Sequence, residues 1–341
     1  MKKKIGFKFN YTFLLLGLLL LILVFFTITK SSMLWKGDTW LSMAMQFPEY
    51  GVMTLGVMLC FIAGCIDVSF VALGDLSSIF ACMFWIKMTE NGEGNLGLII
   101  VGGILIALVA GAVGGFINGN LISRLGIPPI LATLATQLVF RGIAIGLTQG
   151  YAVSGIPSIF SEVGHIYVFG FLPVPLLVFL LVFLFVGFLL KFTTYGRKLY
   201  MIGSNPKAAR FSAINTTRMI NATFVINGMI AAVGALLMVS TMNSAKADYG
   251  SIYLMRCILI LVLAGVLPDG GMGKIFNVLL AVITIQIIAT SVNMFPELNT
   301  YYGSLIWGGL LLVVLMATSR LLGAERKVRK REKKALPKAE G

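Results

Sequence analysis

Charged residues make up only 12% of this 341-residue sequence, and histidine occurs once, as His165. Soluble domains carry about a quarter charged residues, so a compact water-soluble enzyme is excluded. The metalloprotease motif H-E-x-x-H and the hydrolase motif G-x-S-x-G are both absent. The four cysteines lie in apolar stretches without zinc or redox spacing, and we predict no metal site and no catalytic residue in this chain.

A phosphate-binding loop is also missing. The nearest approach to G-x-x-x-x-G-K-[ST] is "PDGGMGKI" at 268–275, where Pro268 replaces the first glycine and Ile275 replaces the hydroxyl residue. Ionisable residues within apolar stretches are few, although ion-coupled carriers usually need some. If the chain moves a solute, the energy is expected to come from another subunit.

Long apolar runs, by contrast, recur from Tyr11 to Ser319. A helix needs about 20 mostly apolar residues to cross a bilayer. The first run is too long for a signal peptide and lacks a cleavage site, so it is kept as a span. We predict an all-α polytopic membrane protein with a single domain over 1–341 and a basic tail at 320–341. The ten predicted spans are 11–29, 41–63, 68–86, 97–122, 129–149, 172–190, 219–241, 254–267, 275–294 and 303–319.

The eighth predicted span, 254–267, is short, and a re-entrant or buried helix is the alternative. The number of crossings favours a full span, because with one crossing fewer the basic tail would lie outside the cell. Basic residues set the orientation of membrane proteins, with Lys and Arg enriched on the cytoplasmic side. Most of the 27 Lys and Arg fall in the segments that are inside when both termini are cytoplasmic. This distribution explains the net charge of +14 without nucleic acid.

One cytoplasmic segment, "GRKLYMIGSNPKAARFSAINTTR" at 196–218, is basic and carries a helix start. Ser204 or Asn205 is a cap, and Pro206 suits the first helical position. With Gly203 and Asn215 as breaks, the pattern predicts a helix of about two turns. A loop that only obeys the charge rule is the simpler alternative, but such a loop needs no capped helix.

This segment resembles the loop of the sugar-type permease family of bacterial ABC importers, which includes ribose, galactose, arabinose and autoinducer-2 permeases. The family pattern is close to G-R-x-x-Y-A-I-G-x-N-P-x-A-A-x-x-S-G-I. "GCIDVS" at 64–69 and "GIPPILATLATQLVFRGIAIGLTQG" at 126–150 are similar to two further motifs of the family. The resemblance implies that the segment forms a coupling helix seated on the ATP-hydrolysing subunit. The residues expected to act in this coupling are Gly203, Asn205, Pro206, Ala208, Ala209, Arg210, Ser212 and Ile214.

The sequence departs from the family pattern at three places. Cys65 and Ala213 each replace a usual glycine, and we interpret both as small-for-small changes that leave the role intact. "GVLPDGGMGK" also differs from the family's G-G-x-S-L-x-G-G-x-G at its start.

Polar residues inside the spans are candidates for the translocation path or for helix breaks. Asp67 lies at a glycine-rich break, where we prefer capping of a half-helix beginning at Val68 over contact with the solute. Arg141 is a candidate partner of Asp67 or Asp75, and snorkelling to the interface is the alternative. The predicted set is Asp67, Ser69, Asn118, Thr133, Thr136, Gln137 and Arg141, with Asn227, Gln286 and Asn293 as further polar residues that either line the path or join helices.

Gly111, Gly115 and Gly119 repeat at four-residue spacing and predict a close helix contact, within the chain or with a second permease. We found no clear internal repeat, although the short eighth span and the break at 64–75 are possible counterparts in two halves.

The resemblance implies the permease subunit of a binding-protein-dependent ABC importer for a simple sugar or sugar-like solute in the bacterial inner membrane. The implied partners are an ABC ATPase subunit that binds ATP and Mg²⁺, a second permease and an extracytoplasmic solute-binding protein. The chain itself needs no cofactor. The alternatives are a branched-chain amino acid or nucleoside permease and an ion-coupled secondary carrier.

Overall fold

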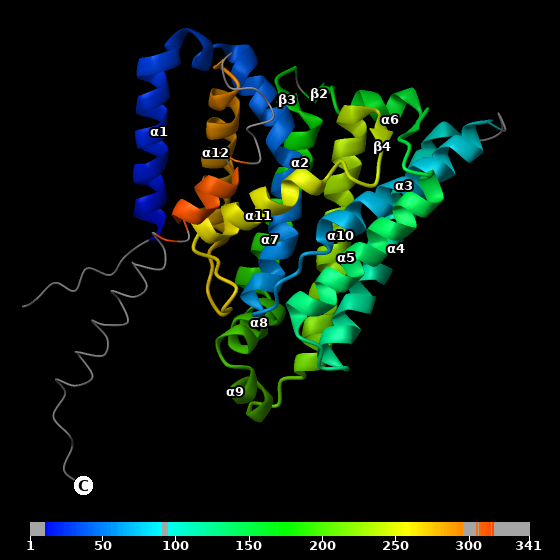
Figure 1. The fold of residues 1–341 in the computed structure, drawn as a ribbon, viewed down its shortest axis with the longest axis vertical. Helices are drawn as coiled ribbons and strands as arrows, with labels where there is room; N and C mark the ends of the chain where they lie inside the picture. Colours follow the sequence, from blue (N-terminus) through cyan, green and yellow to red (C-terminus); the bar gives the residue numbers. More distant parts are fainter. Residues whose placement is uncertain are drawn as a thin grey trace, which may run out of the picture.

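The computed structural model describes residues 11–90, 95–168, 170–295, 305, 307–314 and 316. Some of the long helices stand upright in Figure 1 and others are clearly tilted against them, while short helices lie at both ends and in the middle of the molecule. Those long enough to span a membrane by length and composition are α1 (Tyr11–Leu34), α2 (Gly37–Ile62), α3 (Phe70–Glu90), α4 (Leu96–Ser123), α5 (Pro129–Thr148), α7 (Val174–Phe192), α10 (Thr216–Met242) and α12 (Ile275–Val292). The shorter helices are α6 (Ser158–Val163), α8 (Thr194–Ser204), α9 (Pro206–Phe211) and α11 (Ser251–Leu263).

The predicted fold class is confirmed, and nine predicted spans coincide with helices whose ends differ by a few residues. Of the tenth span, 303–319, the structure describes ten residues, all helical; the basic tail lies outside the described residues. Two short antiparallel pairs join the loops, β1 (Val153–Ser154) with β4 (Ser244–Ala245) and β2 (Tyr167–Val168) with β3 (Leu172–Pro173).

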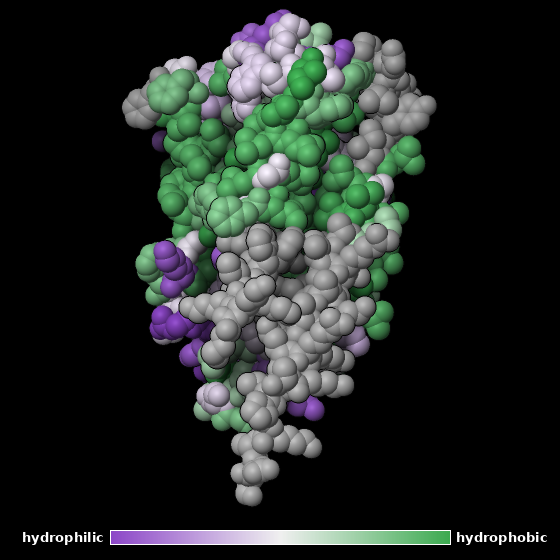
Figure 2. All heavy atoms as spheres, turned by 90° about the vertical axis from the view of Figure 1, so that its left-hand side faces the viewer, coloured by the Kyte–Doolittle hydropathy of each residue, from purple (hydrophilic) through white to green (hydrophobic). Residues whose placement is uncertain are grey.

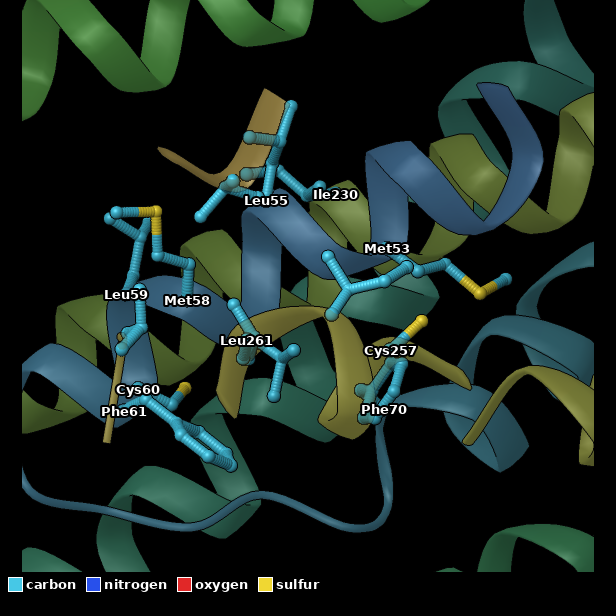
Figure 3. Packing of buried hydrophobic residues seen from close by; sticks show 14 of the residues in the cluster. Met53, Leu55, Met58, Leu59, Cys60, Phe61, Phe70, Ile230, Cys257 and Leu261 are labelled. Carbon is cyan, nitrogen blue, oxygen red and sulfur yellow. The ribbon is translucent and has the colours of Figure 1, made fainter. Parts of the chain in front are cut away.

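The core forms around α2, whose second half is buried without interruption from Pro48 to Ile62. Its apolar side chains pack against those of α10 and α11, including Ile230 and Leu261 (Figure 3). α1, α4, α5 and α7 leave large apolar side chains exposed along their outer faces. On the face that Figure 2 turns toward the viewer, which is the α1 side of the molecule, apolar side chains make a broad belt with hydrophilic residues above and below it, as expected for a chain surrounded by lipid.

The glycine repeat of α4 marks a contact within the chain. A side chain at Gly111 would overlap the carbonyl oxygen of Gly228, and one at Gly115 would overlap that of Phe224. Gly119 lies equally close to Asn221. The repeat therefore brings the backbones of α4 and α10 together, which settles the alternative that the sequence left open.

The short eighth span is α11, which has 13 residues and would extend only about 20 Å as a helix. The segment that follows α11 continues in the same direction as far as the end of α2. There the N–H of Gly271 donates to the carbonyl of Ile62 at 2.8 Å. α11 begins beside Glu49, whose carboxylate accepts from the hydroxyl of Tyr253. The stretch from 251 to 271 thus runs alongside α2 over the length of residues 49–62.

The ends of α2 and α11 are built alike. Gly64 and Gly265 both take a left-handed conformation, with φ of 77° and 73°. The next N–H in each case donates back to the residue five positions earlier, Cys65 to Cys60 and Val266 to Leu261, both at 2.9 Å. This is the Schellman ending of a helix, and it follows an Ala-Gly pair in both sequences.

Candidate functional site: two short helices joined to a broken helix

The segment predicted to couple to a partner folds as two helices, α8 and α9, which lie together at one end of the molecule (Figure 1). α9 confirms the predicted helix start. The side chain of Asn205 accepts from the N–H of Ala208 at 3.1 Å, and Pro206 occupies the first position. Its role in coupling stays a prediction.

α8 was not predicted, and the expectation that Gly203 is a break is wrong, because Gly203 lies within the last turn of α8. The helix is amphipathic. It buries Leu199 and Ile202 against the membrane domain and exposes Arg197 and Lys198 on its other side. Because its apolar face packs on the core of the membrane domain, α8 fixes the position of α9.

The exposed face of α9 contains a residue that the sequence analysis missed. Phe211 is 92% exposed, although it is an aromatic residue in a basic segment. Lys207 and Arg210 lie exposed beside it, whereas Ala209 is buried against the protein. The available signal was a single aromatic residue among charged ones. An exposed aromatic flanked by cations is typical of the anchors at protein interfaces.

α9 is capped at Ser212, and the next residue, Ala213, takes a left-handed conformation with φ of 58°. The N–H groups of Ala213 and Ile214 donate back to the carbonyls of Arg210 and Ala209, again a Schellman ending. This position normally favours glycine, which is the residue of the family pattern. Ala213 is therefore not a neutral small-for-small change, because the cost lies in the backbone and not in side-chain size.

Replacing Ala213 by glycine is expected to stabilise the end of α9 by about 1 kcal/mol, since glycine adopts the left-handed conformation without strain. Hydrogen exchange of the amides that close the ending should slow by about fivefold. Ala208→Gly is the matched control, since the same change inside a helix is expected to speed local exchange. Equal effects of the two substitutions would contradict this account.

A junction of glycine backbones connects α8 to the membrane domain. Three segments meet there: the last turn of α8, the end of α2 with its break, and the loop before α12. A side chain at Gly203 would overlap the carbonyl oxygen of Ile62 and the nitrogen of Gly271. One at Gly270 would lie 2.8 Å from the Cα of Gly64 and 2.9 Å from that of Gly203. We call Gly64, Gly203, Gly270 and Gly271 the glycine junction.

One side-chain hydrogen bond reinforces the junction. The hydroxyl of Tyr200 on α8 donates to the carbonyl of Gly273 at 2.7 Å. Burial raises the pKa of the Tyr200 phenol above its ordinary value, so it stays a hydrogen-bond donor at neutral pH. α8 and the loop before α12 are therefore held together by both backbone packing and a hydrogen bond.

The break after α2 leads directly into a buried polar cluster. Asp67 is 2% exposed, and one carboxylate oxygen accepts from the N–H and the hydroxyl of Ser69 at 2.8 and 2.7 Å. Its other oxygen accepts from the side-chain amide of Asn227 on α10 at 2.7 Å. Asn118 on α4 donates to the hydroxyl of Ser69 at 2.7 Å, and Thr133 on α5 donates to the carbonyl of Ile66 at 3.2 Å.

This arrangement is that of a helix cap, and α3 begins at Phe70 rather than at the expected Val68. The cluster joins the start of α3 to α4, α5 and α10. Four members of the predicted path set, Asp67, Ser69, Asn118 and Thr133, thus meet in one place. The hydrogen bonds of this cluster satisfy the N–H of Ser69 and the carbonyl of Ile66 at the break. The amide oxygens of Asn118 and Asn227 are buried and have no hydrogen-bond partner in the described part of the chain.

The remaining members of the predicted set lie on α5 and point elsewhere. Thr136 is buried and donates to the carbonyl of Thr133 in its own helix at 3.3 Å. Gln137 is partly exposed and Arg141 is exposed. Of the alternatives considered for Arg141, pairing with Asp67 is not formed, because Asp67 bonds to Ser69 and Asn227 instead. Within the described part of the chain Arg141 forms no ion pair with Asp75 either, although its charge acts on that carboxylate.

Comparison with known proteins places this geometry in a family. Residues 39–315 match the family described as "Branched-chain amino acid transport system / permease component". "Autoinducer 2 import system permease protein LsrD" of Yersinia enterocolitica is 30% identical over 318 residues, which cover 92% of each chain. The protein of the same name from Photorhabdus luminescens is 30% identical over 321 residues, covering 92% of this chain and 93% of the relative. No solved structure matches.

Proposed function

Because the chain belongs to the family of branched-chain amino acid transport system permease components, we propose that it is the membrane subunit of an ATP-driven importer for a sugar or sugar-like solute. The observation that carries the proposal is the capped helix α9, which presents Phe211 and a basic face away from the membrane domain. A secondary carrier has no use for such a docking surface.

The proposed orientation places both termini, α8 and α9 on the cytoplasmic side of a bacterial inner membrane. The basic residues of 191–218 support it by the positive-inside rule. The exposed face of α9 then meets an ABC ATPase subunit, which binds ATP and Mg²⁺. A second permease subunit and an extracytoplasmic solute-binding protein complete the complex.

The solute class rests on the relatives and on the loop motif. Two relatives covering nearly the whole chain are named as autoinducer 2 import permeases. Autoinducer 2 is a small polar solute, and the loop at 196–214 resembles that of sugar-type permeases. A branched-chain amino acid is therefore the less favoured cargo. Uptake of labelled autoinducer 2, ribose and leucine by cells that express the whole complex tests this choice, and uptake of leucine alone would refute it.

The proposed mechanism is alternating access driven through the glycine junction. Movement of the ATPase subunits on ATP binding displaces α9 and α8 together. Gly203 at the end of α8 touches the end of α2 and the loop before α12, so both receive the displacement. The break after α2 passes it to the cluster around Asp67, which is bonded to α4, α5 and α10. Displacement of α9 is thus passed to the spans α2, α3, α4, α5, α10 and α12.

Replacing Phe211 by alanine is expected to weaken binding of the ATPase subunit by about 30-fold, the effect of losing an interface anchor worth about 2 kcal/mol. The measurement is recovery of the ATPase subunit with the tagged permease in mild detergent. Phe171→Ala is the matched control, because Phe171 is also exposed but lies in the loop before α7, at the opposite end of that helix from α8. Unchanged recovery with Phe211→Ala would remove α9 as the docking surface.

A further inference from the structure

A groove of about 910 Å³ lies between α7, α8 and the start of α12. Its walls are mostly apolar and aromatic. Phe188 is 57% exposed, Phe192 is 65% exposed and Phe276 is 52% exposed, so all three offer apolar surface to the groove that they line. Phe188 and Phe192 stack on one another with ring centroids 5.9 Å apart.

One end of the groove is cationic. Lys191 lies in the last turn of α7, and Lys274 immediately precedes α12. Both are exposed and both line the groove, whose described lining residues include no Asp or Glu. Because one lysine ends a span and the other begins one, the two charges lie at the level of the membrane surface.

We propose that this groove binds an anionic phospholipid of the cytoplasmic leaflet. The phosphate of its headgroup pairs with Lys191 and Lys274, and an acyl chain lies along the phenylalanine walls. The inference rests on the orientation given under Proposed function, which places α8 inside the cell. A groove that is basic at the membrane surface and apolar along its length matches the two ends of such a lipid.

The groove borders the hydrogen bond that joins α8 to the loop before α12, next to the glycine junction. Tyr200 and Gly273 line the groove and are hydrogen-bonded to one another at 2.7 Å. Tyr200 lies one helical turn before Gly203 of the glycine junction. A bound lipid therefore packs against the bond that holds α8 to the loop before α12, and its loss is expected to weaken coupling.

The test measures lipid binding directly, with phosphatidylglycerol and phosphatidylcholine as probes. Native mass spectrometry of the full-length chain should show phosphatidylglycerol retained in preference to phosphatidylcholine. In the variant Lys191→Gln/Lys274→Gln the affinity for phosphatidylglycerol should fall roughly tenfold or more, since each cation contributes about a fivefold effect. Lys36→Gln/Lys87→Gln removes the same charge from two exposed lysines at the other ends of the spans and should leave retention unchanged.

A second variant blocks the groove without changing its charge. A side chain at Gly187 would meet Ile275 at an ordinary contact distance of 3.5 Å, so this position accepts one. Gly187→Trp should fill the groove and abolish retention, whereas Gly187→Ala should not. Equal retention of both lipids by the wild-type chain would overturn the proposal. So would unchanged retention of phosphatidylglycerol in both Lys191→Gln/Lys274→Gln and Gly187→Trp.

Recovery of the ATPase subunit is measured on the same samples. If the wild-type chain retains phosphatidylglycerol through Lys191 and Lys274 but recovers no ATPase subunit, the proposed function fails while the lipid site stands. If the ATPase subunit is recovered and no phosphatidylglycerol is retained, only the lipid site fails.

Discussion

Replacing Gly203 by alanine is expected to reduce solute uptake by about 10- to 100-fold while the ATPase subunit still binds. The added methyl group would overlap the carbonyl oxygen of Ile62 and the nitrogen of Gly271, both backbone atoms that no rotamer change can move aside. Forcing an extra carbon into such a contact costs about 1–3 kcal/mol or separates the segments. Separation breaks the route from α8 to α2, whereas the exposed face of α9 is unchanged.

The measurement is uptake together with ATPase recovery from the same membranes. Gly17→Ala is the matched control, because Gly17 lies on α1 with nothing near its missing side chain. Tyr200→Phe provides a milder test in case Gly203→Ala does not fold. It deletes only the hydrogen bond to Gly273 and is expected to reduce uptake a few-fold. Wild-type uptake in both variants would show that the junction does not transmit movement.

Replacing Asp67 by alanine is expected to destabilise the protein even without solute. The N–H and hydroxyl of Ser69 and the amide of Asn227 would each lose an acceptor. An unsatisfied buried donor costs about 1–3 kcal/mol. Removing the carboxylate also relieves the cost of placing this charged group in the membrane, about 2.5–3.5 kcal/mol. The combined cost of the three unsatisfied donors is expected to exceed this gain. The apparent melting temperature of the purified chain should fall by several degrees.

This measurement separates a cap from a solute contact, the two roles considered for Asp67. A residue that only contacts the solute would leave the melting temperature of the solute-free protein unchanged and lower the affinity for the solute. Asp38→Ala is the control, because Asp38 is an exposed acid in the first turn of α2 and its removal should shift the melting temperature little. An unchanged melting temperature in Asp67→Ala would assign this carboxylate to the solute.

The parts of the structure that depend on nearby residues could be predicted from the sequence. Apolar length predicts the spans, and Asn205 with Pro206 predicts the start of α9, since a cap acts within one helical turn. α8 was missed for the converse reason. Gly203 suggests a break when only local propensity is considered. In the fold it lies in the last turn of α8, and glycine is needed there because the backbones of Ile62 and Gly271 leave no room for a side chain.

Partners distant in the sequence account for the remaining differences. The spacing of Gly111, Gly115 and Gly119 predicts a close contact, yet nothing in it names α10 as the neighbour. Charge alone suggests Arg141 for Asp67, but the carboxylate is satisfied by Ser69 and Asn227, and no local pattern indicates an amide 160 residues away. Exposure of Phe211 likewise depends on the direction in which α8 and α9 leave the membrane domain.

The glycine junction also bears on how such permeases diversify. Its contacts are made by main-chain atoms, which every amino acid possesses. The sequence must supply only glycine at four positions, for space at Gly203, Gly270 and Gly271 and for the left-handed backbone at Gly64, Gly270 and Gly271. Side chains facing the cargo are then free to change without altering the machinery that moves them. After duplication of its gene, such a subunit could change its solute while it keeps the glycine junction unchanged.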